Sequence, residues 1–465
     1  MGILQNNKIY RELKSVFSNR TIRSRVLFTL GIILLYRFFA NIPPAGIDVA
    51  QFNNLLNNNP LSNIFTIATG GRLDNPSLVM LGMGPYINAS IIIQLLSTVI
   101  PKMEQLSKEG NQGRQVLNMY TRYLTIPLAI LQSIVVYIIL SNSAIIITGG
   151  NQMSLNLITF IATIAAGSML MMWLGEIISE RGIGNGSSVL ISFGIISSLP
   201  ALFLTDFGAV GQTLSRLFSD ILAGSTDIYG VIGILTAPEM IYAYGIVIFL
   251  MILVTVIVLM SEGERKVKVN YSRTVGGAQV NYLPLRVNQS GVMPIIFASA
   301  VLAMPGILSQ LFMNISNEAS TIYKVSVWVQ NSFLTRYNSF EYVLLDIVMI
   351  IAFSYFYIFV VTKPSNIAEN INKSGGYIPG IRPGNATTKY LNTLLFQLTT
   401  IGGLFLALIA IMPTLFRSLY GVNTNTIGII SGIGGTSLLI IVSVLLLTFR
   451  QIQSLKVSKS YDKYR

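Results

Sequence analysis

The side chains that carry out acid–base or nucleophilic chemistry are sparse in this sequence. The chain of 465 residues has no cysteine and no histidine. The lack of cysteine excludes thiolate nucleophiles, cysteine metal sites and disulfides, and the lack of histidine removes the commonest proton-transfer group near neutral pH. The carboxylates form no cluster with metal-ligand spacing, and no phosphate-binding glycine loop with its lysine occurs. We therefore expect no catalytic residue, no metal and no cofactor.

The few charged residues within apolar stretches lie near the ends of those stretches. Arg37, Glu176, Glu180 and Asp346 are all placed in this way. A proton- or ion-coupled transporter usually carries titratable groups near the middle of the membrane. An uncharged interior favours a conduit over an enzyme. A small-solute secondary transporter is the alternative function, and a polytopic membrane enzyme is a weaker one.

The apolar stretches themselves predict a polytopic membrane protein. Hydrophobic residues make up 52% of the chain and charged residues only 11%, against roughly 25% charged in soluble domains. A membrane-spanning helix needs about 20 apolar residues. Residues 1–25 are too polar to serve as a signal peptide. Ten candidate spans follow, at 26–42, 77–100, 123–143, 156–175, 187–205, 240–261, 290–313, 342–362, 391–413 and 427–449.

The basic residues give the orientation. With ten spans both termini lie on one side, and that side holds all but six of the 31 Lys and Arg residues. The positive-inside rule places this side in the cytoplasm. The six exceptions are Arg37, within the first span, and Arg72, Arg216, Lys324, Arg336 and Arg417 on the other side. The net charge of +13 is thus spread over one membrane face, which favours anionic lipid or an acidic partner over a nucleic-acid-binding domain.

The order of the spans predicts two halves of five. We expect a cytoplasmic N-terminal segment at 1–25, an N-terminal half at 26–205, an external hinge region at 206–239, a C-terminal half at 240–449 and a cytoplasmic tail at 450–465. Because each half has an odd number of spans, any repeat between the halves must be inverted, as in many transport proteins. No residue-level repeat is visible in the sequence.

Three interruptions of the apolar pattern stand out. Residues 61–71, "LSNIFTIATGG", are too short to span, so they form either a surface loop or a re-entrant segment. Pro85 and Pro294 fall early in the second and seventh spans, where we expect kinks. Residues 372–385, "NKSGGYIPGIRPGN", form a polar loop in which Arg382 lies between two prolines.

Several stretches resemble the SecY family, the central subunits of protein-translocation channels. They are "YRFFANIPPAGID", "GPYINASIIIQLL", "EGNQGRQVLNMYTRYLT", "MWLGEIISERGIGNG", "NYLPLRVNQSGVMPIIFASA", "KPSNIAENINKSGGYIPGIRPG" and "GGTSLLI". Their order and spacing match the family from about residue 25 to 450. The resemblance implies an all-α bundle of ten transmembrane helices, in two pseudo-symmetric inverted halves around a central pore.

The resemblance also assigns residues to parts of such a channel. The apolar pore ring would be Met83, Ile87, Ser187, Ile191, Ile296 and Ile440. The plug below the pore mouth would include Leu61, Ile64, Phe65, Ile67, Gly70 and Gly71. The lateral gate would include Ile91, Gln94, Gln132, Pro294 and Phe297. The docking surface for a motor or ribosome would include Arg265, Lys266, Lys268, Arg273, Arg286, Arg382 and Lys389.

Partners and location follow from the same resemblance. It implies SecE-like and SecG-like membrane subunits, the SecA motor ATPase, the ribosome with its RNA, signal peptides and nascent polypeptides, and anionic lipids. The location would be the bacterial plasma membrane, with a plastid thylakoid membrane as the alternative. The stretch "TVGGAQVNY" carries no charge where the family has a further basic cluster. This difference leaves open whether the motor or the ribosome dominates.

Overall fold

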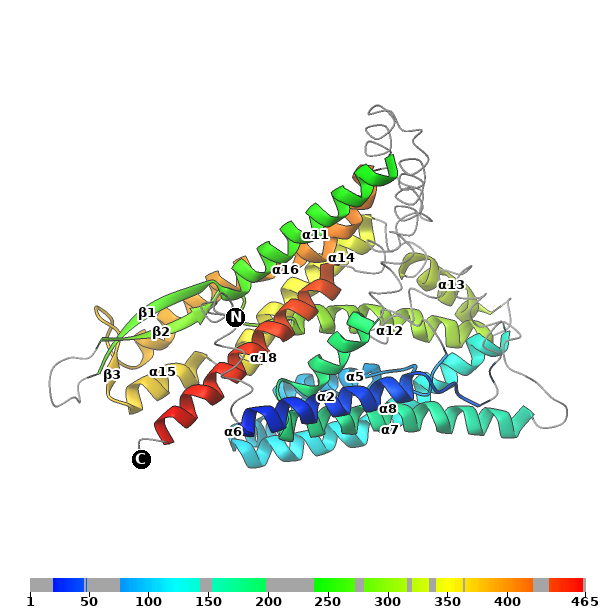
Figure 1. The fold of residues 1–465 in the computed structure, drawn as a ribbon, viewed down its shortest axis with the longest axis horizontal. Helices are drawn as coiled ribbons and strands as arrows, with labels where there is room; N and C mark the ends of the chain where they lie inside the picture. Colours follow the sequence, from blue (N-terminus) through cyan, green and yellow to red (C-terminus); the bar gives the residue numbers. More distant parts are fainter. Residues whose placement is uncertain are drawn as a thin grey trace, which may run out of the picture. The chain divides into compact units, whose positions relative to one another are not determined.

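Helices dominate the parts of the chain that the structure describes. The computed structural model describes residues 20–45, 47, 76–142, 153–197, 238–271, 280–315, 320–333, 340–362, 364–420 and 435–462. A helix coincides with each of the ten expected spans (Figure 1). These helices are α2 (Arg20–Ala40), α5 (Gly84–Val99), α7 (Asn111–Asn142), α8 (Met153–Arg181), the helix Gly186–Ser197, α11 (Pro238–Glu262), α12 (Met293–Ile315), α14 (Phe340–Tyr357), α16 (Asn385–Tyr420) and α18 (Gly435–Asp462). The helical, polytopic fold class is confirmed.

Not every helix that coincides with an expected span is long and apolar enough by itself to cross a membrane. Within the described residues five helices are, and there is a sixth if α5 and α6 (Pro101–Lys108) count as one span bent by 101°. Shorter apolar helices are described at Gly186–Ser197, Val247–Glu262 and Met293–Gly306. The ten-helix layout is consistent with these segments.

The chain divides into two compact units. One unit comprises Met1–Ser197, Ser299–Tyr337 and Val444–Arg465, and the other comprises Ser198–Ala298 and Asn338–Ser443. We refer to them as unit 1 and unit 2. Of the predicted hinge region at residues 206–239, only the last two residues are described, at the start of α11 (Pro238–Glu262), so the two-half boundary stays a prediction.

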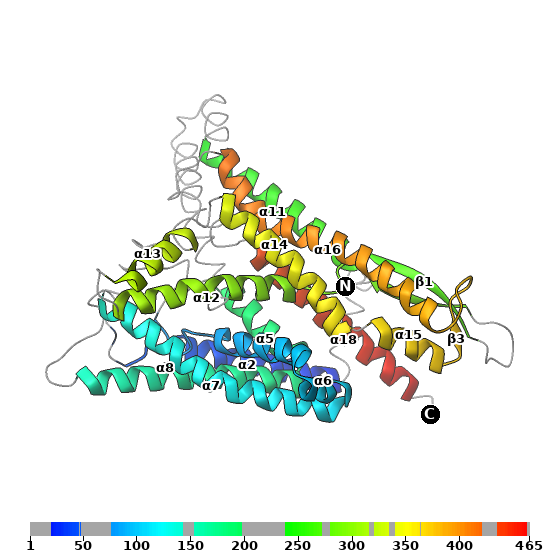
Figure 2. The ribbon, with the colours of Figure 1, turned by 180° about the vertical axis from the view of Figure 1, so that it is seen from behind.

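Unit 1 is built on helices that lie side by side. Helix α7 packs against α5 and α8, and α2 packs against α8 (Figures 1 and 2). Polar side chains within these helices bond to their own backbone. The hydroxyl groups of Thr125 and Ser133, both fully buried, donate to carbonyls one turn earlier. A buried hydroxyl is thereby satisfied without a partner in lipid.

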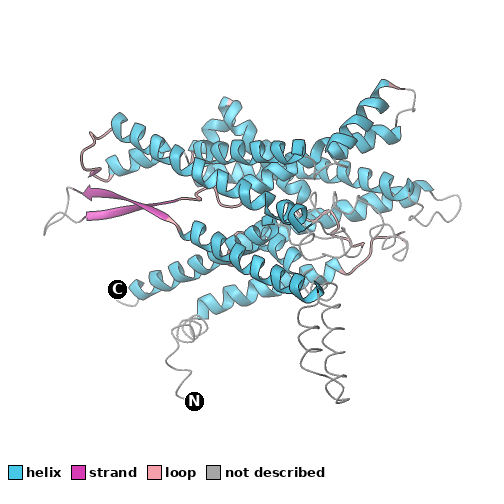
Figure 3. Ribbon diagram, turned by 90° about the horizontal axis from the view of Figure 1, so that it is seen from above, coloured by secondary structure: helices cyan, strands magenta, loops and turns pink. Residues whose placement is uncertain are grey.

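Unit 2 carries a small sheet, which the sequence analysis did not predict. Strands β1 (Glu264–Tyr271), β2 (Val280–Arg286) and β3 (Gly376–Tyr377) form an antiparallel sheet in the order β2-β1-β3 (Figure 3). Val267 and Val269 are buried, whereas Lys266 and Lys268, which alternate with them, are exposed. This alternation is the period-two pattern of a strand with one buried face.

An apolar core lies beneath the sheet and joins it to helices from the C-terminal part of the chain. Helix α15 (Pro364–Lys373) packs against α16 and β3. The core consists of Val267, Val269, Leu285, Ile358, Ala368, Ile371, Ile378, Leu391, Leu394 and Leu395. Ile378 of this core lies within the polar loop at residues 372–385, so the loop is anchored to the same core as the sheet.

The two expected proline kinks are wrong. Residues 78–83 form turns, and α5 begins only at Gly84, which puts Pro85 in its first turn. Helix α12 begins at Met293, so Pro294 also lies at a helix start. Proline fits the first helical turn because its missing N–H has no intrahelical acceptor there. Pro127 lies inside α7, and Pro305 lies inside α12.

We expect the Leu391→Ala substitution to loosen the whole platform of sheet and loop. Leu391 is fully buried in the core of unit 2, and removing a buried leucine side chain costs about 2–5 kcal/mol. The variant should lose thermal stability in detergent, and trypsin should cut faster at Lys373 and Lys389. The control is Asn392→Ala, at an exposed position of the same helix. Equal digestion rates in both variants would contradict this account of the core.

Candidate functional site

The candidate site comprises the pore ring, the lateral gate and the docking surface, and the structure describes most of their residues. Unit 1 holds Met83, Ile87, Ser187 and Ile191 of the ring, with Ile91, Gln94 and Gln132 of the gate. Unit 2 holds Ile296, Ile440, Pro294 and Phe297. Since ring and gate each draw on both units, both assignments stay predictions. The predicted plug, residues 61–71, lies outside the described residues.

Within unit 1, Gly175 of α8 is the point where two ring residues come together. A Cβ atom placed on Gly175 would lie 3.4 Å from Met83 Cε and 3.6 Å from the Ser187 backbone nitrogen. Met83 directly precedes α5 and is 2% exposed. These are ordinary van der Waals separations, so Gly175 of α8 lies next to both the start of α5 and the start of the helix Gly186–Ser197.

The helix Gly186–Ser197 begins with a capped turn, and Ser187 belongs to that cap. Asn185 Oδ1 accepts hydrogen bonds from the Ser187 backbone N–H (3.2 Å) and from the Ser187 hydroxyl (2.7 Å). The Asn185 carbonyl accepts from the Val189 N–H (2.9 Å). Ser187 therefore satisfies its polar group locally. Ile191, one turn further along, is 7% exposed.

The turn before this helix is held by side chains from three other elements of unit 1. The Ile183 N–H donates to Thr29 Oγ1 of α2 (3.0 Å), and the Gly184 N–H donates to Gln451 Oε1 of α18. The Gly186 N–H donates to Ser179 Oγ of α8 (2.9 Å). We call these three contacts the turn clamp. They supply acceptors for the free N–H groups of a chain reversal between two membrane helices.

The backbone of the clamped turn requires glycine at two positions. Gly184 has φ of 90°, in the left-handed region that other residues rarely adopt. Gly186 lies so close to α8 that an added Cβ atom would be 1.8 Å from the Gly175 carbonyl oxygen. In the sequence "GIGNG", Gly184 is therefore needed for its backbone conformation and Gly186 for its close contact with α8.

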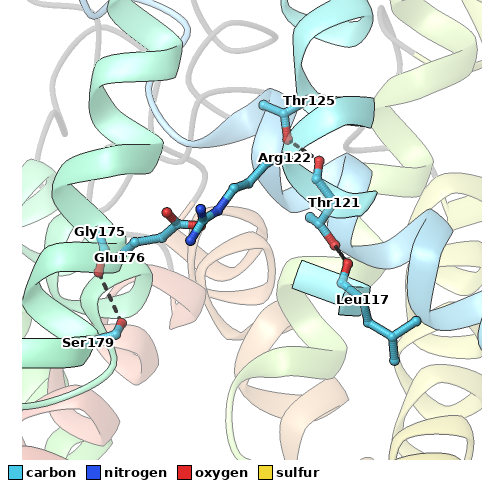
Figure 4. A network of polar contacts seen from close by, with 7 residues as sticks. All are labelled: Leu117, Thr121, Arg122, Thr125, Gly175, Glu176 and Ser179. Atoms are coloured by element: carbon cyan, nitrogen blue, oxygen red, sulfur yellow. Dashed lines mark hydrogen bonds and ion pairs between the residues drawn. The ribbon is translucent and has the colours of Figure 1, made fainter. Parts of the chain in front are cut away.

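An ion pair joins α7 to α8 near the clamped turn. Arg122 Nε lies 2.7 Å from Glu176 Oε1, with side chains 48% and 18% exposed (Figure 4). Glu176 directly follows Gly175. An ion pair of this exposure contributes at most about 1 kcal/mol to stability. Its role is to fix α7 and α8 against each other. The sequence places both residues near the same predicted membrane face, but no local pattern pairs them.

The gate residues of unit 1 are buried polar and apolar side chains on neighbouring helices. Ile91 is 3% exposed and Gln132 is 8% exposed, on α5 and α7 respectively. Gln94 Nε2 donates to Ser90 Oγ (3.3 Å), one turn away on α5. In unit 2, Phe297 is 3% exposed and its ring meets Phe353 edge to face at 5.9 Å. These side chains pack within their own units.

The docking residues gather in unit 2 on the sheet and on the loop after β3. Lys266 and Lys268 lie on the exposed face of β1, opposite Pro284 and Tyr282 of β2. Arg265 and Lys389 are exposed and Arg286 is half-buried. Arg273 lies outside the described residues. Tyr282 is 52% exposed and Tyr377 of β3 is 41% exposed, so aromatic rings accompany the lysines.

Arg382 has a fixed backbone and an exposed side chain. The Arg382 carbonyl accepts from the hydroxyl of Thr387 (3.0 Å), whose side chain is buried. The Ile381 N–H donates to the Ile378 carbonyl (3.1 Å), which closes the preceding turn. Gly380 and Gly384 have φ of 82° and 102°. Arg382 is therefore exposed on a turn whose backbone is held by these contacts.

Comparison with known proteins gives consistent relatives. The SecY family model matches residues 77–449. Proteins named protein translocase subunit SecY are similar over nearly the whole chain. The one from Corynebacterium glutamicum is 36% identical and covers 96% of this chain and 98% of its own, and the one from Synechococcus elongatus is 38% identical and covers 95% and 94%.

Solved structures agree on the fold. A protein-conducting channel superposes with a TM-score of 0.63 at 20% identity, covering 95% of this chain and 94% of its own. Sec61 from a canine ribosome–channel complex gives a TM-score of 0.60 at 18% identity, with the same coverage. At these identities the likeness supports the ten-helix channel fold and nothing finer.

We expect Gly186→Ala to destabilise unit 1. The new methyl group would overlap the Gly175 carbonyl oxygen, which is backbone and cannot rotate away, and overpacking of this kind costs about 1–3 kcal/mol. The measurement is the unfolding temperature of the purified protein in detergent. Gly31→Ala, in α2 of the same unit, is the control because its added Cβ meets nothing within 4 Å. Equal unfolding temperatures would show that the α8 contact is looser than described.

Proposed function

This chain belongs to the SecY family, and from that premise we propose that it is the pore-forming subunit of a protein-conducting channel. It moves unfolded polypeptides across a membrane and releases apolar segments sideways into the lipid. The observation that carries the proposal is the family match over residues 77–449, together with translocase relatives that align over nearly the full length. The small-solute transporter has no comparable support.

The apolar pore ring is the proposed seal. A narrow apolar constriction dewets and thereby blocks ions, yet it makes no strong bond to a passing chain. The buried positions of Met83 and Ile191 in unit 1 and of Ile440 in unit 2 support an apolar role for these residues. Ser187 is assigned a structural part in the ring, because its hydroxyl is bonded to Asn185.

The docking surface is the proposed site of energy input, since we assign no catalytic residue to the chain itself. The partners would be the ribosome, with its RNA, or the SecA motor. A channel solved in a ribosome complex has the same fold, which supports the ribosome as a partner. Arginine pairs with carboxylate or phosphate through two parallel hydrogen bonds, so Arg382 suits either partner. Exposed lysines and tyrosines on the sheet extend the same surface.

Membrane subunits and orientation complete the proposal. SecE-like and SecG-like subunits would accompany the chain, signal peptides and nascent polypeptides would be its substrates, and anionic lipids would contact its basic face. Both termini would lie in the cytoplasm of a bacterium, with the chain in the plasma membrane. The distribution of Lys and Arg supports this orientation.

Translocation of a preprotein into proteoliposomes tests the function. Vesicles that hold the chain with its membrane subunits should protect an added preprotein from protease when the motor and ATP are present. Arg382→Glu should lower this protection at least about tenfold, because like charges placed together at an interface cost several kcal/mol. The free energy of unfolding should change by less than about 0.5 kcal/mol, since Arg382 is exposed.

The matched control is Lys373→Glu, which makes the same charge change at an exposed residue outside the rigid turn. Lys373 forms an exposed ion pair with Glu369 (2.7 Å), so its loss should matter little. If both variants lowered protease protection equally, Arg382 would contribute only to the overall positive charge of this face and would have no specific contact with a partner. Absence of protection with the unaltered chain would refute the channel function itself.

The ring is tested by ion conductance. Replacing Ile87 and Ile191 together with serine should raise the resting conductance of the channel in planar bilayers, because a wetted constriction loses its barrier to ions. The control is the double variant Ile130→Ser and Ile158→Ser, at exposed positions of α7 and α8. If the double serine variant had the same resting conductance as the unaltered channel, Ile87 and Ile191 would not be part of the seal.

A further inference from the structure

Helix α13 (Thr321–Phe333) is an element that the sequence analysis missed and the proposed function does not use. In chain order it lies between α12 and α14. Arg382 follows the other end of α14, so α13 connects the helix ends that lie away from Arg382. The connecting segments are residues 316–320 and 334–339. An extended chain covers at most about 3.6 Å per residue, so these segments keep α13 within about 20–25 Å of both helix ends.

The side chains of α13 are distributed in the opposite way to those of a water-exposed helix. Ile322, Val325 and Trp328 are 54%, 55% and 65% exposed, and their spacing of three places them on one face. Ser326, on another face, is only 4% exposed. A helix that turns large apolar residues outward and buries a serine is suited to an apolar surrounding on its outer face.

We propose that α13 lies flat in the boundary between headgroups and acyl chains of the leaflet opposite to Arg382, with Ile322, Val325 and Trp328 inserted into the lipid. Tryptophan favours this boundary because its ring is apolar and its N–H is polar. Lys324 is exposed on the flank of this face, where its long side chain reaches the headgroups. Such a helix holds the connection between two spans at a fixed depth.

Exposed apolar side chains on the neighbouring helix α12 favour lipid over a protein partner as the occupant of the apolar face of α13. The last turns of α12, which belong to the same unit as α13, expose Leu308 (39%) and Phe312 (49%). These side chains lie on an expected membrane span, so their exposed surface is in contact with acyl chains. The apolar face of α13 begins a few residues later in the chain, at the point where that lipid-facing surface reaches the membrane boundary.

Tryptophan fluorescence tests the proposal directly, because the chain has only two tryptophans. Trp173→Phe leaves Trp328 as the sole fluorophore, and Trp173 is an exposed residue of α8 whose conservative replacement should preserve the fold. The full chain is reconstituted into phosphatidylcholine–phosphatidylglycerol vesicles with brominated acyl chains. We expect blue-shifted emission from Trp328 and stronger quenching by bromine near the headgroups than near the chain ends. Aqueous acrylamide should quench little.

Two outcomes would overturn the proposal. Quenching by acrylamide without quenching by brominated lipid would place the face in water. Insensitivity to both quenchers would mean that protein covers it. A second probe is independent of tryptophan: Val325→Cys gives a unique thiol in this cysteine-free chain. A spin label there should be more accessible to oxygen than to a water-soluble nickel chelate, and the reverse order would also refute the proposal. The inference needs only that α12 and α14 span the membrane, so it can fail or hold independently of protein translocation.

Discussion

The absence of water from the hydrocarbon core constrains this structure more than any other factor. A backbone N–H or C=O group exposed to lipid costs several kcal/mol, so a spanning segment must be helical and every break needs substitute partners. The turn between α8 and the helix Gly186–Ser197 shows how the chain meets this requirement. Thr29, Ser179 and Gln451 each accept one N–H of the turn, and they come from three different helices. The turn clamp thereby makes the start of the helix Gly186–Ser197 depend on the first and last described helices of the chain.

The same constraint accounts for the position of the sheet. In the part of the chain that the structure describes, the strands come from segments between expected spans, where water can satisfy the edges of a sheet. Strands β1 to β3, α15 and the Arg382 turn share a single apolar core, so the charged groups above it are held by packing beneath them. Rigidity of the docking surface therefore comes from buried leucine, isoleucine and valine. The charge of Arg382 itself contributes little to it.

Hydropathy alone located the ten spans, because long apolar segments have few alternative folds. The finer features needed other signals. The alternation in "ERKVKV" indicates a strand, but the sequence analysis assigns its basic residues only to a docking surface. Pro85 and Pro294 do not kink their helices, although the sequence analysis expects kinks there. Hydropathy does not locate the first residue of a helix, so it cannot distinguish a proline in the first turn from one in the interior. The pair of Arg122 and Glu176 joins residues 54 positions apart, and the clamp joins Gly184 to Gln451, which no local pattern encodes. Pore ring, gate and docking residues came from the family resemblance.

The central claim is that polypeptide passes beside the ring residues of unit 1, and site-specific disulfide formation tests it most directly. The chain has no cysteine, so Ile191→Cys introduces a single thiol. A preprotein with one cysteine, stalled in transit by a folded domain, should form a disulfide with this thiol when an oxidant such as copper phenanthroline is added to take up the two electrons. Trp173→Cys is the matched comparison, because it lies on the exposed side of α8 near Gly175. The account predicts a disulfide at residue 191 and none at 173. Equal yields at both positions, or a disulfide only at 173, would contradict it.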